Sequence, residues 1–218
     1  MKRIVLMLGA LALYLTSVVP ATNAAAQVHI YRGSDQLALA TFQRTDGTIV
    51  TYATILANDG YYQSPPQEPT PTPFPYVTVA IFQYDTTCPP WQAGCSVTMY
   101  ANGFTQATVF QTSHDLSSAV LNATVTMTDE VTGRSFPLAI DLRWTGYGDT
   151  LRNVGSPFKI REPGIIVTIT GNDYRRRADV AGSVVDLNTG VDFTAQADVY
   201  AELERASGNT IMVQLGGY

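Results

Sequence analysis

The sequence contains few charged residues. Asp, Glu, Lys and Arg make up 14% of its 218 residues, and 13 basic against 18 acidic side chains give a net charge of -5. A nucleic-acid partner is not expected, because proteins that bind phosphate backbones need a basic surface. With 45% hydrophobic residues, the chain is also too apolar for intrinsic disorder. The low charge and the high hydrophobic content together indicate a globular protein.

Histidine and cysteine are also scarce, with two residues of each. A closed zinc site needs four ligands, and His29 and His114 lie far from each other and from the cysteines in the sequence. Cys88 and Cys95 flank a turn-rich segment between two strand-like runs. We expect these two cysteines to form a disulfide, which is typical of proteins outside the cytoplasm and would order one loop tip.

Long hydrophobic runs are absent after residue 26, so no membrane span is expected in the mature chain. Residues 1–26 have the features of a bacterial secretory signal peptide. Lys2 and Arg3 form its charged start, residues 4–19 its apolar stretch, and three alanines precede Gln27. This pattern predicts export to the cell surface or periplasm, and the alternative is an uncleaved anchor. Cleavage would remove two basic residues and leave a net charge of -7.

Helical periodicity is weak in the mature sequence, whereas alternation with period two is frequent. Apolar and polar residues alternate through residues 121–128 and again through 136–144, with Thr132-Gly133 between them. Such alternation predicts an antiparallel hairpin with one buried face.

The hairpin motif occurs twice. The pattern D-x-x-T-G-x-x-F-x-x-x-x-D-[L/V] begins at Asp129 and again at Asp186. Two copies are too few for a solenoid. We therefore expect duplicated hairpins, with residues 191–203 as the second return strand, in an all-β antiparallel β-sandwich or barrel. The expected sandwich is Ig-like or jelly-roll-like, with no substantial helix after the signal peptide.

Turn signals separate further expected strands. The strands are predicted at residues 28–31, 37–43, 49–56, 77–84, 97–101, 105–111, 165–170, 180–185 and 211–215. The turns between them are predicted at Thr45-Asp46-Gly47, Asn58-Asp59-Gly60, Asn102-Gly103 and Gly171-Asn172-Asp173.

Half of the 12 prolines lie within residues 63–75. Such a stretch favours an extended, polyproline-like conformation. Residues 27–62 are too few to fold alone, so we expect a Pro-rich surface loop within a single domain of residues 27–218. A linker between two domains and a peptide ligand for a partner are the alternatives.

Few arrangements in the sequence could support catalysis. Ser113-His114-Asp115 contains the residues of a triad, but neighbouring side chains point to different sides, so a polar turn is expected. Paired carboxylates could serve a hydrolase. The candidates are Asp129, Glu130, Asp141, Asp186, Asp198, Glu202 and Glu204. We expect these residues to be solvated, with no catalytic residue and no cofactor, although Asp129 and Asp186 are weak candidates for calcium ligands.

Aromatic residues are more numerous candidates for a binding site. Trp91, Tyr84 and Tyr100 lie within or beside the cysteine segment, where exposed rings could bind a glycan. The only basic run is Arg175, Arg176 and Arg177, which could pair with an anionic ligand or guard an exposed edge strand.

The leading hypothesis is an exported, non-catalytic structural or interaction module at the cell surface. The alternative is a glycan-binding module that uses Trp91, Tyr84 and Tyr100 and is assisted by calcium. A surface polysaccharide or another extracellular protein would be the partner. A small hydrolase, the third hypothesis, would need two carboxylates that converge in a cleft.

Overall fold

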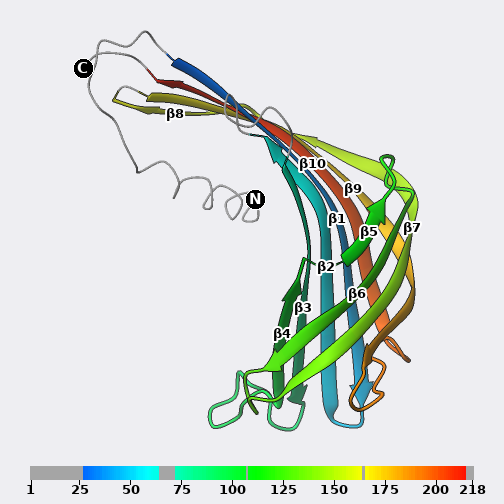
Figure 1. The fold of residues 1–218 in the computed structure, drawn as a ribbon. Helices are drawn as coiled ribbons and strands as arrows, with labels where there is room; N and C mark the ends of the chain where they lie inside the picture. The colour runs from blue at the N-terminus through cyan, green and yellow to red at the C-terminus, as the bar shows by residue number, and fades with distance from the viewer. Residues whose placement is uncertain (1–26, 64–71, 107, 164, 215–218) are drawn as a thin grey trace.

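The computed structural model describes residues 27–63, 72–106, 108–163 and 165–214, which form one antiparallel sheet of ten strands (Figure 1). The strands are β1 (Gln27–Asp46), β2 (Ile49–Gln63), β3 (Thr72–Asp85), β4 (Met99–Thr105), β5 (Thr108–Thr112), β6 (Ser118–Asp129), β7 (Ser135–Val154), β8 (Phe158–Glu162), β9 (Ile165–Asp186) and β10 (Asp198–Gln214). The predicted all-β antiparallel class is confirmed, and the described residues contain no helix.

The sheet closes on itself. Its strand order is β10-β1-β2-β3-β4-β6-β7-β9-β8, and β9 also pairs with β10. The 22 residues of β9 make this closure possible, because residues 165–177 pair with β10 and residues 172–186 pair with β7. Opposite walls of the closed sheet therefore face each other across one core, as the two sheets of a sandwich do. We call this closed part the body.

Alternate residues of the strands fill the core of the body. All apolar positions that the alternation predicts in residues 121–127 and 136–144 are buried. Trp144 is 1% exposed, and its indole N–H donates a hydrogen bond to the backbone oxygen of Leu39 at 3.0 Å. The core cluster includes residues from every strand except β8. The strand pairing thus yields a single hydrophobic core.

Four strands continue beyond the body as a single layer, which rises to the upper left in Figure 1. We call this layer the arm; it comprises residues 28–32 of β1, 158–161 of β8, 165–170 of β9 and 209–213 of β10. At its base, Gly208 of β10 pairs with Gly33 of β1 on one side and with Gly171 of β9 on the other. A row of residues without side chains allows a sheet to bend sharply.

Three predicted turns lie inside strands. The segments at Asn58, Asn102 and Gly171 belong to β2, β4 and β9, and the predicted strands on either side of Gly171 merge into β9. Glycine there permits close approach rather than chain reversal. A Cβ atom on Gly60 would meet the Asp35 carboxylate, for example. The turn after β1 is confirmed, with Gly47 at a φ of 60°.

The Pro-rich stretch joins two neighbouring strands. β2 and β3 pair continuously from Ile49 with Asp85 to Tyr62 with Thr72. Residues 64–71 of the predicted surface loop lie outside the described residues, as does the predicted signal peptide, residues 1–26. The remainder of the expected loop is strand, because Gln63 ends β2 and residues 72–75 begin β3. Prolines are tolerated at this end of β3, since the described β4 pairs with β3 only from Val77 onward.

The duplicated motif forms the same turn in both copies. The N–H of Gly133 donates to the backbone oxygen of Asp129 at 2.8 Å, and the N–H of Gly190 donates to that of Asp186 at 2.7 Å. Both aspartates are buried, at 5% and 2% exposure. Their carboxylates accept bonds from backbone N–H groups two residues ahead, at 3.1 and 2.8 Å. The prediction that these two carboxylates are solvated is therefore wrong, because the turn buries them and supplies their hydrogen-bond donors.

The two copies diverge after the turn. Ser135 begins the long strand β7, whereas Phe193 donates one backbone hydrogen bond to Val184 at 2.9 Å before the chain turns again. The predicted second return strand, residues 191–203, therefore begins only at Asp198. From Asp198 onward the chain forms β10, which pairs with β1. The local sequence does not encode this pairing.

We predict that removing the Asp129 carboxylate destabilises the protein. Burial raises the pKa of Asp129, but hydrogen bonds from Thr132, Tyr100 and Val131 outweigh burial, and the pKa lies below its usual value. Asp129→Ala should lower the free energy of unfolding in urea at pH 7 by about 2–3 kcal/mol, because buried N–H donors lose their acceptor.

Asp141→Ala is the matched control, because Asp141 belongs to the same motif but is exposed, and it should cost less than about 0.5 kcal/mol. Because the pKa of Asp129 is lower in the folded protein than in the unfolded chain, its carboxylate stabilises the fold at pH values above the unfolded-state pKa. This stabilisation is lost as the pH falls through the folded-state pKa. The Asp129→Ala deficit should therefore shrink below about pH 4. Equal deficits in both variants would contradict this account of the turn.

Candidate functional site

Aromatic side chains gather on the outer face of β2, β3 and β4. Val77, Val79 and Ile81 of β3 are buried in the core, so the alternate residues of this strand face outwards. Residues paired directly across strands share a face, which places further rings from β2 and β4 beside them. We call this surface the aromatic stripe; its members are Tyr52, Phe74, Tyr76, Phe82, Tyr84, Trp91, Tyr100 and Phe104.

Trp91 lies at one end of the stripe. Its loop is closed by the Cys88–Cys95 disulfide, with 5.2 Å between the Cα atoms, and this bond confirms the prediction. The Trp91 ring stands edge-on to Tyr84, with 5.3 Å between ring centroids and 65° between planes. It is 73% exposed. The disulfide loop therefore holds a largely solvated indole beside Tyr84, the last outward-facing residue of β3.

Three rings form the other end of the stripe. Phe74 and Tyr76 lie 5.5 Å apart at 67°, whereas Tyr76 and Phe104 lie 6.0 Å apart at 27° and are stacked. Phe74 and Phe104 are each more than half exposed. Phe74 and Tyr84 are ten residues apart on one strand, so the stripe extends over about 33 Å.

An acidic side chain, Glu130, lies beside the stripe. Glu130 accepts a hydrogen bond from the Asn102 amide at 3.2 Å, and its backbone N–H donates to the Tyr100 oxygen at 2.8 Å. The cation–π contacts of the described residues involve Phe136 and Tyr174, which are not part of the stripe. The local field therefore does not attract an anionic ligand.

The structure brings the three predicted ligand-binding residues onto one face. Tyr84 and Trp91 are in contact, and Tyr100 pairs with Phe82, the neighbour of Tyr84 on the same side of β3. Sequence reasoning also counts Tyr76 among the aromatic residues that could bind a glycan, whereas it misses Tyr52, Phe74, Phe82 and Phe104. Alternate aromatic residues between positions 74 and 84 were a readable signal, whereas the place of Phe104 requires the register of β4 against β3.

The weak calcium candidates, Asp129 and Asp186, are engaged in other interactions. The second carboxylate oxygen of Asp129 accepts a bond from the Thr132 hydroxyl at 2.6 Å, and that of Asp186 accepts one from Arg134 at 2.9 Å. Within the described part of the chain, no three His, Cys, Asp or Glu residues are placed to hold a metal ion.

The segment Ser113-His114-Asp115 forms a turn. The Ser113 hydroxyl accepts the N–H of Ser118 at 2.8 Å, and the Asp115 carboxylate accepts the N–H of Ser117 at 3.1 Å. Hydrogen bonds from Ser117 lower the pKa of Asp115 to about 2. The serine and the aspartate are thus engaged with the turn itself.

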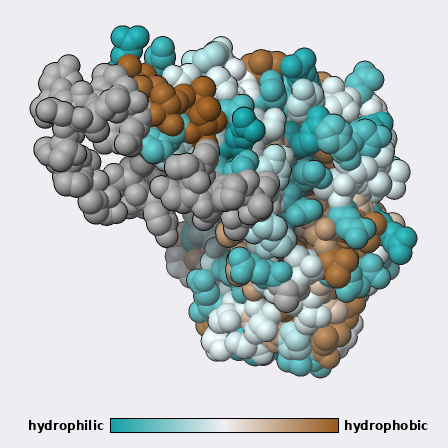
Figure 2. Space-filling view, turned by 45° about the horizontal axis from the view of Figure 1, so that its top comes forward, coloured by the Kyte–Doolittle hydropathy of each residue, from teal (hydrophilic) through white to brown (hydrophobic). Residues whose placement is uncertain are grey.

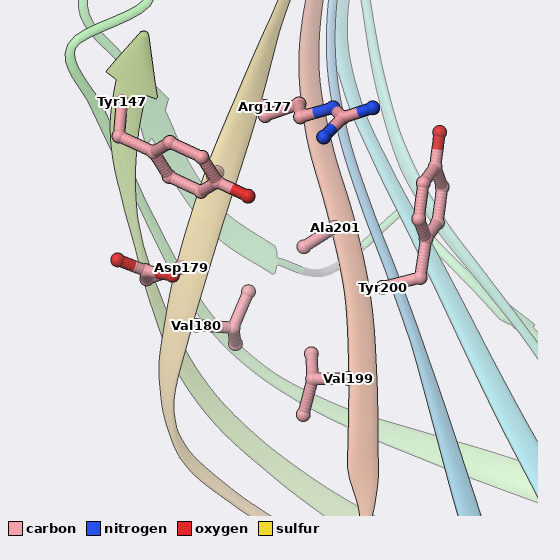
Figure 3. Close-up of a pocket in the computed structure, with 8 residues that line it drawn as sticks. Tyr147, Arg177, Asp179, Val180, Val199, Tyr200 and Ala201 are labelled. Carbon is pink, nitrogen blue, oxygen red and sulfur yellow. The ribbon is translucent and has the colours of Figure 1, made fainter.

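A hollow of about 320 Å³ opens where β9 and β10 separate (Figure 3). The last paired residues are Arg177 and Glu202, and below them β9 follows β7 instead. Tyr147 and Tyr200 flank the hollow from its two sides, with Arg177 between them. Arg177 and Asp179 place opposite charges at the same opening, so the hollow has no evident preference for either charge.

The basic run does not lie on an edge strand, which corrects one of our two interpretations. Arg175 pairs with Glu204 in the stretch of β9 that has neighbours on both sides. Its guanidinium contacts Asp173 at 2.8 Å and Glu204 at 3.6 Å. Burial raises the pKa of Glu204 to about 7, with a further rise from Asp173 that Arg175 opposes. Neither carboxylate lines the hollow of Figure 3.

Comparisons with known proteins add little. No family model matches the chain, and no curated protein matches it. One solved structure with some likeness is the InvG secretin domain β-barrel from the Salmonella SPI-1 injectisome NC-base. It is 8% identical over 98% of this chain and 67% of that chain, with a TM-score of 0.12, which is too low to support an argument.

Two findings bear on location. The disulfide indicates an oxidising environment outside the cytoplasm. Among the described residues, no helix is long and apolar enough to cross a membrane.

We predict that Glu204→Gln stabilises the protein at alkaline pH. Because the pKa of Glu204 is higher in the folded protein than in the unfolded chain, its protonated carboxyl stabilises the fold at pH values below the unfolded-state pKa. This contribution is lost as the pH rises through the folded-state pKa of about 7. The neutral amide avoids that loss. At pH 8 the variant should gain on the order of 1 kcal/mol in the free energy of unfolding, and at pH 5 it should match wild type.

Urea unfolding at both pH values checks this expectation. Glu202→Gln, two residues away on the same face of β10, is the matched control for removing one negative charge. A gain of the same size at pH 5 and pH 8 would show that the titration of Glu204 is not its cause.

Proposed function

We propose that the protein is an exported, non-catalytic interaction module at the cell surface, and that its aromatic stripe binds an extended neutral glycan. The observation that supports this proposal is the gathering of seven aromatic side chains on the outer face of three adjacent strands, with Trp91 of the disulfide loop beside them. Aromatic rings that remain exposed on a folded surface are typical of binding sites.

The dimensions and charge of the stripe favour a neutral polymer. Sugar rings have C–H-rich faces that pack against aromatic faces, and the stacked pair Tyr76 and Phe104 offers such a platform. A length of about 33 Å suits a chain of several sugar units better than a single sugar. The acidic Glu130 beside Tyr100 disfavours an anionic polysaccharide.

A protein partner is the second candidate. The edge-on contact of Tyr84 and Trp91 forms an uneven surface rather than a flat platform. Exposed Trp and Tyr side chains of this kind are common hot spots of protein interfaces.

Thermal unfolding of the exported protein tests the glycan proposal. We expect one member of a panel of soluble β-glucan, xylan and mannan to raise the midpoint, because a ligand at 100 times its Kd adds about 2.7 kcal/mol. Polygalacturonate, which is anionic, should have no effect. Phe104→Ala should abolish the shift.

Phe158→Ala is the matched control, because Phe158 is 57% exposed and Phe104 is 56% exposed, but Phe158 lies on the arm. It should retain the full shift. Coincident midpoints with every polysaccharide would reject a glycan ligand and favour the protein partner. Equal loss of the shift in both variants would reject the stripe as the site.

A further inference from the structure

Some arginines of this chain have acidic partners and others do not. Arg44, Arg134 and Arg175 form salt bridges with aspartate or glutamate side chains. Within the described part of the chain, four arginines on four different strands form no salt bridge with a carboxylate; they are Arg32 of β1, Arg152 of β7, Arg176 of β9 and Arg205 of β10. An acidic protein of net charge -5 thus leaves four cations without an acidic partner.

These four arginines lie on the side of the sheet that faces the core, which we call the inner side. Residues two positions apart in a strand share a side. Three of the arginines stand at an even spacing from a buried core residue of the same strand, which gives the pairs Arg32 and Ala38, Arg176 and Ala178, and Arg205 and Leu203. Arg152 pairs directly with Tyr174 of β9, which contacts the core, and directly paired residues also share a side.

Two of the guanidinium groups contact one aromatic ring. Tyr174 lies between β7 and β10, and the guanidinium carbons of Arg152 and Arg205 are 5.7 and 4.6 Å from its ring centroid. Arg205 also donates a hydrogen bond to the backbone oxygen of His114 at 2.6 Å. A guanidinium group has five N–H donors, so both arginines keep donors for a ligand. Two positive charges beside one ring repel each other, and an anion between them would relieve that repulsion.

A groove lies beside this pair of arginines, at the end of the body where the arm begins (Figure 1). Gly33, Gly171 and Gly208, the base of the arm, form part of its wall. Its volume of about 400 Å³ suits a small ligand. Of the described residues that line it, none is acidic, and the polar side chains are Arg32, Tyr61, Thr170, Asn172, Ser207 and Asn209. The strand register places all six on the inner side, with Asn172 two positions from Tyr174.

The two sides of the sheet differ in charge around this groove. Among the described residues that are paired between strands here, Asp59 of β2 is the acidic one on the inner side, two positions from buried Ala57. Asp149 lies in the bulge of β7, outside the paired register. The other acids near the groove face outwards and are Asp35, Asp173 and Glu204. A small anion would therefore meet an excess of positive charge on the inner side, although the whole chain is acidic.

We propose that this groove binds a small ligand with a dianionic phosphate group, that is, a phosphomonoester. Arginine binds phosphate oxygens through charge-assisted hydrogen bonds, and the hydroxyl and amide groups of the groove supply further donors. Several cations around one groove favour a dianion over a carboxylate, which carries a single charge. This site uses none of the aromatic stripe, so the proposal is independent of glycan binding.

The phosphate group could belong to a free phosphomonoester or to a lipid headgroup. The inner side of the arm exposes Val28, Ile30 and Ile211, at 59%, 36% and 36%, and acyl chains could contact these residues. Figure 2 shows apolar surface gathered at the upper left, toward the outer end of the arm. Both sources present the same phosphate group to the groove, and titration with each of them separates the two.

Isothermal titration calorimetry of the full chain, expressed with its own leader and purified after export, tests the proposal. Glycerol 3-phosphate is the free probe, and dihexanoyl phosphatidic acid below its micellar concentration is the lipid probe. Both should bind, and glycerate, which has a carboxylate in place of the phosphate, should bind at least about 10-fold more weakly. Tighter binding of phosphatidic acid by about 10-fold or more would assign a lipid headgroup, and equal affinities would assign a free phosphomonoester.

Arg32→Gln and Arg152→Gln each remove one cation. Both arginines are exposed, so the variants should fold, and the thermal midpoint of each verifies this. Each should weaken the binding of both phosphate probes by about 10–100-fold, because charge-assisted hydrogen bonds are lost. Arg143→Gln is the matched control, because Arg143 is an exposed arginine of β7 that lies between buried Leu142 and Trp144 and therefore faces outwards. It should bind as wild type does.

The absence of binding by both phosphate probes at millimolar concentration would overturn the proposal. Glycerate that binds as tightly as glycerol 3-phosphate would also overturn it, as would unchanged affinity in both groove variants. An equal loss in Arg143→Gln would show a general response to net charge and would reject the groove as the site. None of these outcomes alters the glycan test, because Phe104 lies on the outer face of β4 and the neutral polysaccharides carry no phosphate.

Discussion

The fold depends on one strand that changes partners. Along 22 residues, β9 pairs first with β10 and then with β7, and it has both neighbours over residues 172–177. This overlap closes the sheet and encloses the core. It also creates the hollow, because β10 and β9 separate once β7 takes over. Before the overlap, β9 has only β8 and β10 beside it, and there the sheet continues as the arm.

The local parts of this fold could be predicted from sequence. Strict alternation identified the hairpin of β6 and β7, and the repeated Asp-x-x-Thr-Gly motif identified two equal turns. Glycine and asparagine were ambiguous, because the same signal marks a chain reversal at Gly47 and a close approach at Gly60. Pairings between distant segments, such as Ala40 with Ala201, leave no local trace. The merging of short strands into β1, β9 and β10 was therefore missed.

The candidate site was predicted only where it is local. Tyr84 and Trp91 are close in sequence, and the disulfide loop keeps them close in space. Tyr76 and Phe104 meet only because β4 pairs with β3 in one register, and a shift of one residue would turn Phe104 into the core. Ring angles depend on packing and were beyond prediction. The result is an uneven stripe with one stacked pair.

The arm and the aromatic stripe are separated by a bend in the sheet. The row formed by Gly33, Gly208 and Gly171 marks where the arm leaves the body, and the loop between β3 and β4 lies at the far end of the body (Figure 1). A polymer bound along the stripe would therefore follow the outer wall of the body, where the core beneath β2, β3 and β4 holds the strands that carry the rings.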